Sequence, residues 1–183
     1  GKKIELALEG GDVEMDREMV EAVIDPLTHI VRNSIDHGIE SPEQRRAVGK
    51  REMGTLRVSA HQSGSQIVIE VADDGRGINT DAVVSKVVSA GLMSIQDVAQ
   101  LSEQAKMELI FTPGLSTAQE VTAISGRGVG MDIVRANIER IGGVISLASE
   151  PGRGLPLTTR VPPTLTIIPG LIMNPGPITS PTP

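Results

Sequence analysis

Ile67-Val68-Ile69-Glu70-Val71-Ala72 runs directly into Asp73-Asp74-Gly75-Arg76-Gly77-Ile78, and this junction decides how the rest of the sequence is interpreted. The alternating apolar residues predict a strand, and the carboxylates and glycines after it predict a tight turn. A carboxylate at a strand end can accept a hydrogen bond from an exocyclic amine, and two close glycines leave room for a flat ring. The stretch is therefore a candidate purine-nucleotide site, although such residues more often make ordinary turns.

The composition excludes several other kinds of site. The chain has 183 residues, one Phe, no Tyr, no Trp, no Cys and a formal net charge of −6. This argues against aromatic stacking of bases, against non-specific nucleic-acid binding and against cysteine chemistry. The sequence contains no signal peptide and no apolar run of membrane-spanning length. We expect a cytoplasmic protein without membrane insertion, cut from a longer chain.

A hairpin delivers the strand to this junction. Polar and apolar residues alternate over Thr55–His61 and again over Ile67–Val71, and residues 62–65 between them are turn formers. This pattern predicts two antiparallel strands with one buried face. The alternation at residues 4–8 predicts a further short strand.

A long helix is predicted between these strands, from about Glu14 to Gly38. Its apolar stripe recurs at steps of three or four residues and consists of Val20, Val23, Ile24, Leu27, Val31 and Ile35. Pro26 interrupts the stripe and predicts a kink or two abutting helices. Gly38 is the predicted C-terminal cap.

Polar side chains follow helical spacing on another side of this helix, at His29, Arg32, Asn33, Asp36 and His37. A solvated face with ion pairs is the simpler explanation. However, a surface helix usually favours Lys and Glu over Asn, Asp and two His. We therefore interpret this face as chemically active.

A second glycine-rich stretch lies downstream of the hairpin. Three short helices are predicted between Asn79 and Phe111, followed by a polar segment from Thr112 to Ser125 that is typical of a lid or binding loop. Ser125-Gly126-Arg127-Gly128-Val129-Gly130-Met131 then leads into a helix, whose N-terminal N–H groups suit a phosphate. The spacing fits neither a Walker loop nor a Rossmann fingerprint, because no Gly-Lys-Ser/Thr follows and Met131 replaces the third glycine.

The end of the chain has a different composition. Strands are predicted at residues 144–149 and about 157–161, and seven of the twelve prolines lie from Pro162 onward. We therefore expect one domain at residues 1–161. Residues 162–183 would be a Pro-rich tail that begins the following domain.

The order of these features resembles the ATPase superfamily of gyrase, heat-shock chaperone, histidine kinase and MutL. Four segments are similar in order and spacing to the ATP-binding domain of chemotaxis histidine kinases of the CheA type, namely residues 25–40, 73–77, 111–117 and 125–132. The similarity extends over about residues 1–168. It implies an α/β fold, a two-layer sandwich in which helices cover one face of a mixed sheet.

The resemblance also implies roles for individual residues. Asp73 would bind the adenine amine beside Gly75 and Gly77, and Asn33 would be the Mg²⁺ ligand. His29 stands where related ATPases have a catalytic glutamate, and it would act as a base or an orienting group. The other implied site residues are Arg32, Asp36 and His37 on the same face, Ser116 in the lid, and Gly126, Gly128, Gly130 and Met131 around the triphosphate.

The implied function is to bind Mg-ATP and to give its γ-phosphoryl group to a histidine on a separate phosphotransfer domain in bacterial chemotaxis two-component signalling. The acceptor is expected in another domain, because two of the three histidines lie on the site face and His61 lies on the hairpin. An adaptor protein, chemoreceptors and, indirectly, response regulators would be partners of the longer protein. We expect this chain to be a monomer and the full-length protein a homodimer.

Two other interpretations stay open. A superfamily ATPase that hydrolyses ATP would carry Glu where His29 stands, which argues against that reading. A weakly active or non-catalytic docking module is suggested by Ala82 and Ala118, where the family often has basic residues. The altered last strand, with Leu155-Pro156 and Pro162-Pro163, points the same way.

Overall fold

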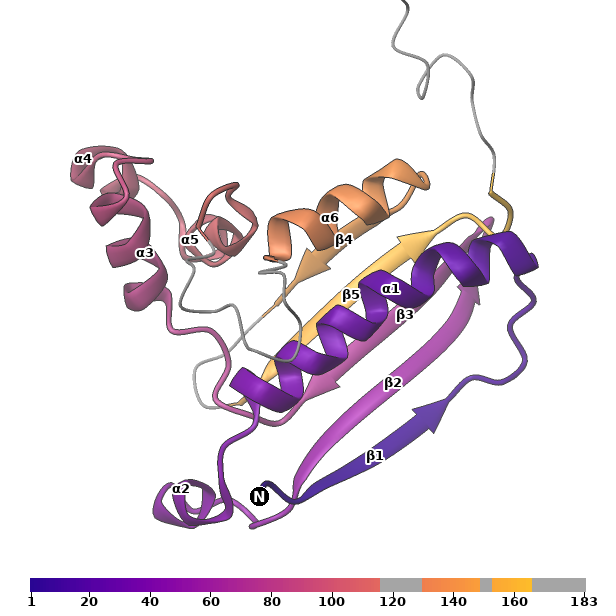
Figure 1. Ribbon diagram of the computed structural model, residues 1–183, viewed down its shortest axis with the longest axis horizontal. Helices are drawn as coiled ribbons and strands as arrows, with labels where there is room; N and C mark the ends of the chain where they lie inside the picture. The colour runs from indigo at the N-terminus through magenta and orange to yellow at the C-terminus, as the bar shows by residue number, and fades with distance from the viewer. Residues whose placement is uncertain (116–129, 149–152, 166–183) are drawn as a thin grey trace, which may run out of the picture.

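A five-stranded sheet with most helices on one side makes up the part of the chain that the computed structural model describes, residues 1–115, 130–148 and 153–165. In chain order the elements are β1 (Ile4–Glu9), α1 (Arg17–Asn33), the π-helical turn η1 (Ser34–Gly38), α2 (Pro42–Ala47), β2 (Gly54–Ser63), β3 (Gln66–Asp73), α3 (Thr80–Ser89), α4 (Ile95–Ala99), α5 (Glu103–Glu108), the 3-10 turn η2 (Leu109–Phe111), α6 (Met131–Arg140), β4 (Val144–Leu147) and β5 (Leu155–Val161). Figure 1 shows α1 and α6 over the same face of the sheet, with α3, α4 and α5 as an arm beside them.

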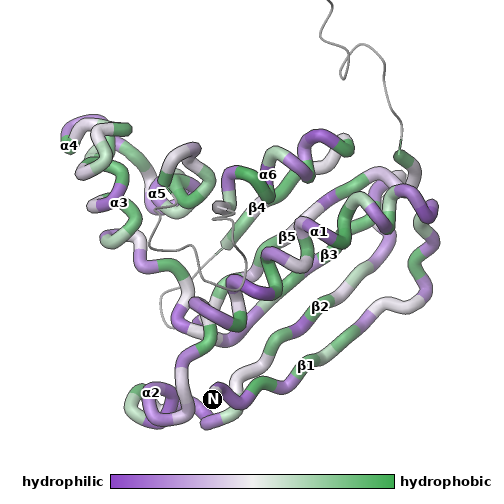
Figure 2. Tube along the Cα trace, in the orientation of Figure 1, coloured by the Kyte–Doolittle hydropathy of each residue, from purple (hydrophilic) through white to green (hydrophobic). Residues whose placement is uncertain are grey.

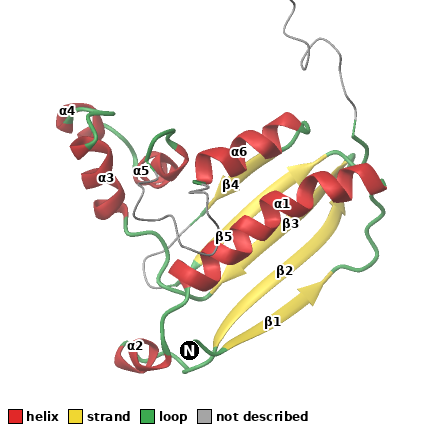
Figure 3. Ribbon diagram, viewed as in Figure 1, coloured by secondary structure: helices red, strands yellow, loops and turns green. Residues whose placement is uncertain are grey.

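The strand order puts the Asp73 junction at the centre of the sheet. The order is β1-β2-β3-β5-β4; β1 is parallel to β2, and the other neighbours are antiparallel. Asp73, the last residue of β3, pairs with Leu56 on one side and with Leu155 on the other. The predicted mixed sheet and two-layer α/β sandwich are confirmed, as Figure 3 shows.

The core lies between this sheet and the two helices. Ile30 of α1 and Val134 and Ile138 of α6 are buried against Leu56, Val71 and Leu157 of three neighbouring strands. Hydrophobic residues recur along α1 and the strands beneath it (Figure 2). Each fully buried aliphatic side chain of this kind contributes about 1.5–3 kcal/mol, so this layer holds α1 and α6 in fixed positions over the sheet.

Helix α1 differs from the prediction in two ways. It runs unbroken through Pro26, so the alternative of two abutting helices is wrong, and the regular helix gives way to η1 only after Asn33. The buried stripe is Met19, Val23, Pro26 and Ile30. The proline ring therefore packs into the core, whereas Ile24 is 50% exposed. Packing of the ring compensates for the helix hydrogen bond that proline cannot make.

Strand β5 tolerates its proline because of where that residue lies. Pro156 is opposite Ala72 of β3, and its carbonyl accepts a hydrogen bond from the Ala148 amide, just beyond the end of β4. The N–H and C=O of one strand residue point to the same side, so the missing donor costs no bond to β3. Strand β5 therefore begins at Leu155, two residues before the predicted start.

Buried ion pairs fix α2 to the end of the sheet. Arg45 is 1% exposed, and its guanidinium donates to Glu40 Oε1 and to Asp74 Oδ2, both at 3.0 Å, and to the Arg51 carbonyl at 2.6 Å. Lys50 Nζ donates to Glu40 Oε2 at 2.8 Å. Burial alone would raise the pKa of Glu40, but the Lys50 hydrogen bond and the charges of Lys50 and Arg45 hold that pKa below its ordinary value.

We predict that Glu40→Gln lowers the free energy of unfolding at pH 7 by about 3 kcal/mol, because it removes the counter-charge of Lys50 and one of the two carboxylates that pair with buried Arg45. A lowered folded-state pKa gives stability that is present above the unfolded value, about 4.3, and is lost as the pH falls through the folded value. The difference between wild type and variant should therefore shrink in acid. Urea unfolding between pH 7 and pH 3 measures it.

Glu103→Gln is the matched control for this measurement. Glu103 pairs with Lys106 at 3.2 Å, but its side chain is 78% exposed, so its removal should cost less than about 1 kcal/mol. Equal losses in the two variants, or a Glu40→Gln loss that does not change with pH, would contradict the predicted role of the buried network.

Candidate functional site

A cavity of about 460 Å³ opens between α1, α3 and the start of α6, a size that suits a small-molecule ligand. Its walls are mainly apolar, with a few polar groups. The lining residues are Ile30, Asn33, Ser34, His37, Gly38, Gly77, Ile78, Asn79, Ala82, Val83, Lys86, Ile110, Leu115, Gly130, Met131, Leu155 and Leu157. Residues from the turn after β3, the long helix and the second glycine-rich stretch therefore meet around one space.

Asp73 lies behind the wall of this cavity. It is 7% exposed, its Oδ1 accepts a hydrogen bond from the Gly75 amide at 2.9 Å, and its buried Oδ2 has no hydrogen-bond partner among the described residues. Burial raises the pKa of the Asp73 carboxyl, while the Gly75 amide, the Ser34 hydroxyl and the Leu155 amide act in the opposite direction. Asp73 is therefore a buried acceptor with unused capacity, next to Ser34 and Leu155, which line the cavity.

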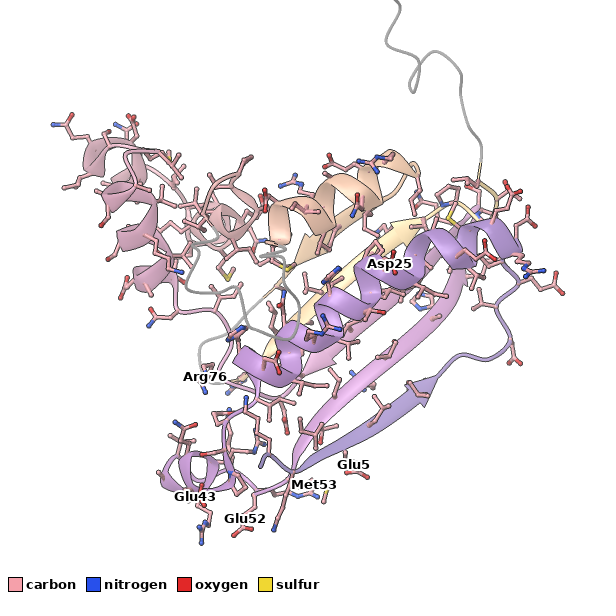
Figure 4. All side chains as sticks on the ribbon, viewed as in Figure 1. Glu5, Asp25, Glu43, Glu52, Met53 and Arg76 are labelled. Atoms are coloured by element: carbon pink, nitrogen blue, oxygen red, sulfur yellow. The ribbon has the colours of Figure 1, made fainter. Side chains whose placement is uncertain are left out.

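Two glycines bring the end of η1 against the turn after β3. The Arg76 amide donates to the Gly38 carbonyl at 2.8 Å, and Figure 4 shows Arg76 beside the end of α1. A Cβ on Gly75 would collide with the Gly38 carbonyl, and a Cβ on Gly38 would lie 3.0 Å from Asp73 Oδ2. The predicted role of Gly38 as a C-terminal cap in the left-handed conformation is wrong, because its φ is not positive. Gly38 is required for this close approach.

The turn then reverses at Gly77, whose φ is +73°, a region that favours glycine. This conformation directs the chain along the edge of the cavity to Asn79. There the Asn79 side chain caps α3 by accepting from the Ala82 amide at 3.1 Å. The predicted helix cap is confirmed, and α3 becomes one wall of the cavity.

The opposite wall combines Asn33 with the N-terminus of α6. Asn33 Nδ2 donates to the Met131 sulfur at 3.2 Å, which directs the amide oxygen of Asn33 elsewhere. Gly130 is the N-cap of α6 and provides no side-chain cap. The first amides of α6 lie at the positive end of the helix dipole, where an anion is favoured. The Asn33 side chain thus lies beside a candidate phosphate site.

The predicted site residues separate into three groups. Asn33, His37, Gly77, Gly130 and Met131 line the cavity, with Asp73 and Gly75 buried behind it. His29 is half-buried on α1, one turn before Asn33, whereas Arg32 and Asp36 are exposed, and none of these three lines the cavity. Ser116, Gly126 and Gly128 lie outside the described residues, as does most of the predicted lid.

Sequence reasoning missed two polar groups of the cavity. Ser34 is buried beside the Asp73 carboxyl, and Lys86 lines the wall formed by α3. Lys86 follows Ala82 by four residues, so both lie on the same face of α3. This i, i+4 spacing was the available signal. Lys86 places a positive charge one helical turn after position 82, where the family often has a basic residue.

Two further observations concern metals and membranes. Residues 1–115, 130–148 and 153–165 contain no cluster of three or more His, Asp or Glu side chains arranged to hold a metal ion. None of the helices in these ranges has both the length and the apolar character needed to span a bilayer.

Comparisons with known proteins agree with this geometry. Residues 22–165 match the family described as "Histidine kinase-, DNA gyrase B-, and HSP90-like ATPase". The chain is 47% identical over 167 residues to "Chemotaxis protein CheA" of Klebsiella aerogenes and 44% identical over 167 residues to that of Bacillus subtilis. It is 46% identical over 168 residues to "Sensor histidine kinase CheAY" of Helicobacter pylori. These matches cover 91–92% of this chain but only 21–25% of the relatives.

One solved structure supports the fold. The catalytic domain of histidine kinase ThkA is 18% identical, with a TM-score of 0.51, and the match covers 88% of this chain and 79% of that one. The sequence identities confirm the resemblance to the CheA-type ATP-binding domain that the four motifs indicated. The chain therefore belongs to the family of histidine kinase-, DNA gyrase B- and HSP90-like ATPases, which bind ATP.

Proposed function

We propose that this chain binds Mg-ATP and transfers the γ-phosphoryl group to a histidine on a separate phosphotransfer domain, as part of a bacterial chemotaxis kinase. The observation that carries the proposal is the meeting of Asn33, the Gly77 turn and the start of α6 around one cavity. The high identity to CheA proteins supports the choice of kinase over other members of the family.

The adenine end of the ligand would lie against the turn after β3. Asp73 would accept the exocyclic amine through Oδ2, and Gly75 and Gly77 would let the backbone approach the ring. The unpartnered Oδ2 supports this role, because a buried acceptor without a partner costs free energy until a donor reaches it. Apolar side chains such as Ile78 and Leu157 would cover the ring, since the chain has almost no aromatic residues.

The triphosphate would extend towards α6. Gly126, Gly128, Gly130 and Met131 would surround it, and Lys86 supplies a positive side chain on the α3 wall. The Asn33 amide oxygen would hold Mg²⁺ together with phosphate oxygens, and the ion would neutralise charge on the transferred group. Ser116 would close over the nucleotide as part of the lid.

The transfer itself needs a histidine that enters from outside. An imidazole nitrogen of the acceptor forms the new P–N bond, the bond from the γ-phosphorus to the bridging oxygen breaks, and ADP leaves. His29 would accept or orient the imidazole proton that is lost. Arg32, Asp36 and His37, near the same end of α1, would guide the acceptor domain and the phosphates.

The remaining features of the proposal concern the longer protein. Residues 1–161 would be the ATP-binding domain, and residues 162–183 would lead into a coupling domain. Adaptor and receptor contacts, and dimerisation of the full-length protein, would depend on domains outside this chain, and response regulators would receive the phosphoryl group afterwards. The setting would be the cytoplasm.

The direct test mixes this chain with Mg-ATP and a histidine-containing phosphotransfer domain and measures acid-labile phosphate on that domain. Phosphate should appear on the acceptor only when both Mg²⁺ and this chain are present. Rapid release of free phosphate without the acceptor would instead identify a hydrolysing ATPase. No nucleotide binding at millimolar ATP would identify a non-catalytic module.

We predict that Asp73→Ala lowers the affinity for a fluorescent ATP analogue by at least about tenfold, because it removes the charged acceptor for the adenine amine. Asp73→Asn is the matched variant. It keeps an oxygen for the Gly75 amide but presents an NH₂ group to the adenine amine, so binding should be lost while the fold persists. Unchanged affinity in both variants would contradict the placement of adenine.

We predict that Asn33→Ala and His29→Ala still bind the nucleotide analogue but transfer phosphate to the acceptor domain at least about a hundredfold more slowly. His61→Ala is the control, because His61 is exposed on β2 and should leave the transfer rate unchanged. Transfer at the wild-type rate in Asn33→Ala or His29→Ala would contradict the role of that residue.

A further inference from the structure

The turn after β3 has a second set of contacts on the side away from the cavity. Lys50 Nζ donates to the Asp74 carbonyl at 3.0 Å and to the Gly75 carbonyl at 2.7 Å, in addition to its bond with Glu40. Its side chain is only 19% exposed. Two successive carbonyls of a tight turn therefore accept hydrogen bonds from one partly buried ammonium group.

Arg45 supports the same turn from α2. Its NH1 donates to the Asp74 carbonyl at 3.2 Å, and its NH2 donates to Asp74 Oδ2 at 3.0 Å. The other oxygen of that carboxylate accepts from the Thr55 amide at 2.8 Å, which ties the turn to β2. The turn is thus held by charged hydrogen bonds, which are stronger than neutral ones.

One peptide unit connects these cations to Asp73. The Asp74 carbonyl and the Gly75 N–H belong to the same planar trans peptide, so they point in opposite directions. Lys50 and Arg45 bond the carbonyl, while the N–H donates to Asp73 Oδ1 at 2.9 Å. Cations at the carbonyl fix the peptide plane and polarise its N–H. This bond holds the Asp73 carboxylate through Oδ1, and no other described residue hydrogen-bonds Oδ2.

We propose that Lys50 and Arg45 are positioning residues for recognition of the purine 6-amino group. They hold the Asp74–Gly75 peptide, and this peptide holds Asp73 in the orientation that presents Oδ2. The inference rests on the proposed adenine-binding role of Asp73, which it deepens. Its consequence is specific: loss of either cation weakens discrimination for the amine more than it weakens binding of the triphosphate, whose contacts lie at the other end of the cavity.

The test compares two nucleotides on the whole 183-residue chain. ATP and the triphosphate of purine riboside differ only in the 6-amino group, and each is measured by displacement of a fluorescent ATP analogue in the presence of Mg²⁺. The ratio of their affinities does not depend on the fraction of protein that is folded, because both nucleotides bind the same active molecules. A merely structural effect lowers both affinities and leaves the ratio unchanged.

Wild type should prefer ATP by about ten- to a hundredfold, as expected for one hydrogen bond to a charged group. Lys50→Met should reduce this ratio at least about threefold, as expected for a coupled neighbour. Lys50→Gln, which keeps an NH₂ donor group without the charge, serves if the Met variant does not fold. The matched control is Arg46→Met, next to Arg45 in the last turn of α2. Arg46 pairs with exposed Glu52 at 3.3 Å, at the end of the molecule shown in Figure 4, and should keep the wild-type ratio.

The outcomes separate this inference from the proposed function. A wild-type ratio in both Lys50 variants overturns the positioning role and leaves the assignment of Asp73 intact. Equal weakening of both nucleotides also overturns it. Wild-type protein that binds both nucleotides equally overturns the adenine assignment, and the positioning role with it.

Discussion

The hydrogen bond from the Arg76 amide to the Gly38 carbonyl joins the two elements on which the site depends. One is the end of the long helix, where Asn33, Ser34 and His37 lie. The other is the end of the central strand, which presents Asp73. The two backbones meet only because Gly38 and Gly75 lack side chains, since a Cβ on Gly75 would collide with the Gly38 carbonyl. The remaining walls of the cavity are arranged around this contact, so its position sets the distance between the buried carboxylate and the helix side chains.

The two ends of the cavity are built by different physical means. The end near Asp73 is formed by the middle of a sheet and is held by buried charges. It is therefore rigid and suited to distinguishing purine rings that differ in one substituent. The end near Gly130 is formed by the start of α6 and by α3, where a helix dipole and the Lys86 side chain attract negative charge without demanding a fixed shape. A rigid recognition end and a general anion end match the two halves of a nucleotide, as we propose for ATP.

Features with local causes were predictable from the sequence, and features with long-range causes were not. The hairpin, the Asn79 cap and the start of α6 follow from residue alternation and turn formers within a few positions. The continuity of α1 through Pro26 was not predictable, because the burial of the proline depends on tertiary packing, which the local sequence does not reveal. Gly38 was misread as a cap for the same reason: its partner Gly75 is 37 residues later. Lys86 had a local signal in its spacing from Ala82, whereas the Arg45 network had none.

Two carboxylates of nearly equal burial have opposite electrostatic properties at this junction, and the difference separates their roles. Glu40 is 8% exposed and Asp73 is 7% exposed. Burial raises the pKa of Asp73, and the Asp74 carboxylate raises it further, while two amides and the Ser34 hydroxyl offset only part of this. Burial would do the same to Glu40, but Lys50 and Arg45 overcome this effect and lower the Glu40 pKa.

Glu40 has its charge compensated within the fold, which is the property of a structural group. Within the described part of the chain, Asp73 forms no ion pair, and its Oδ2 has no hydrogen-bond partner. A hydrogen-bond donor on a ligand would give Asp73 Oδ2 the partner that it lacks. The same two cations that pair with Glu40, Lys50 and Arg45, also hold the peptide that orients Asp73.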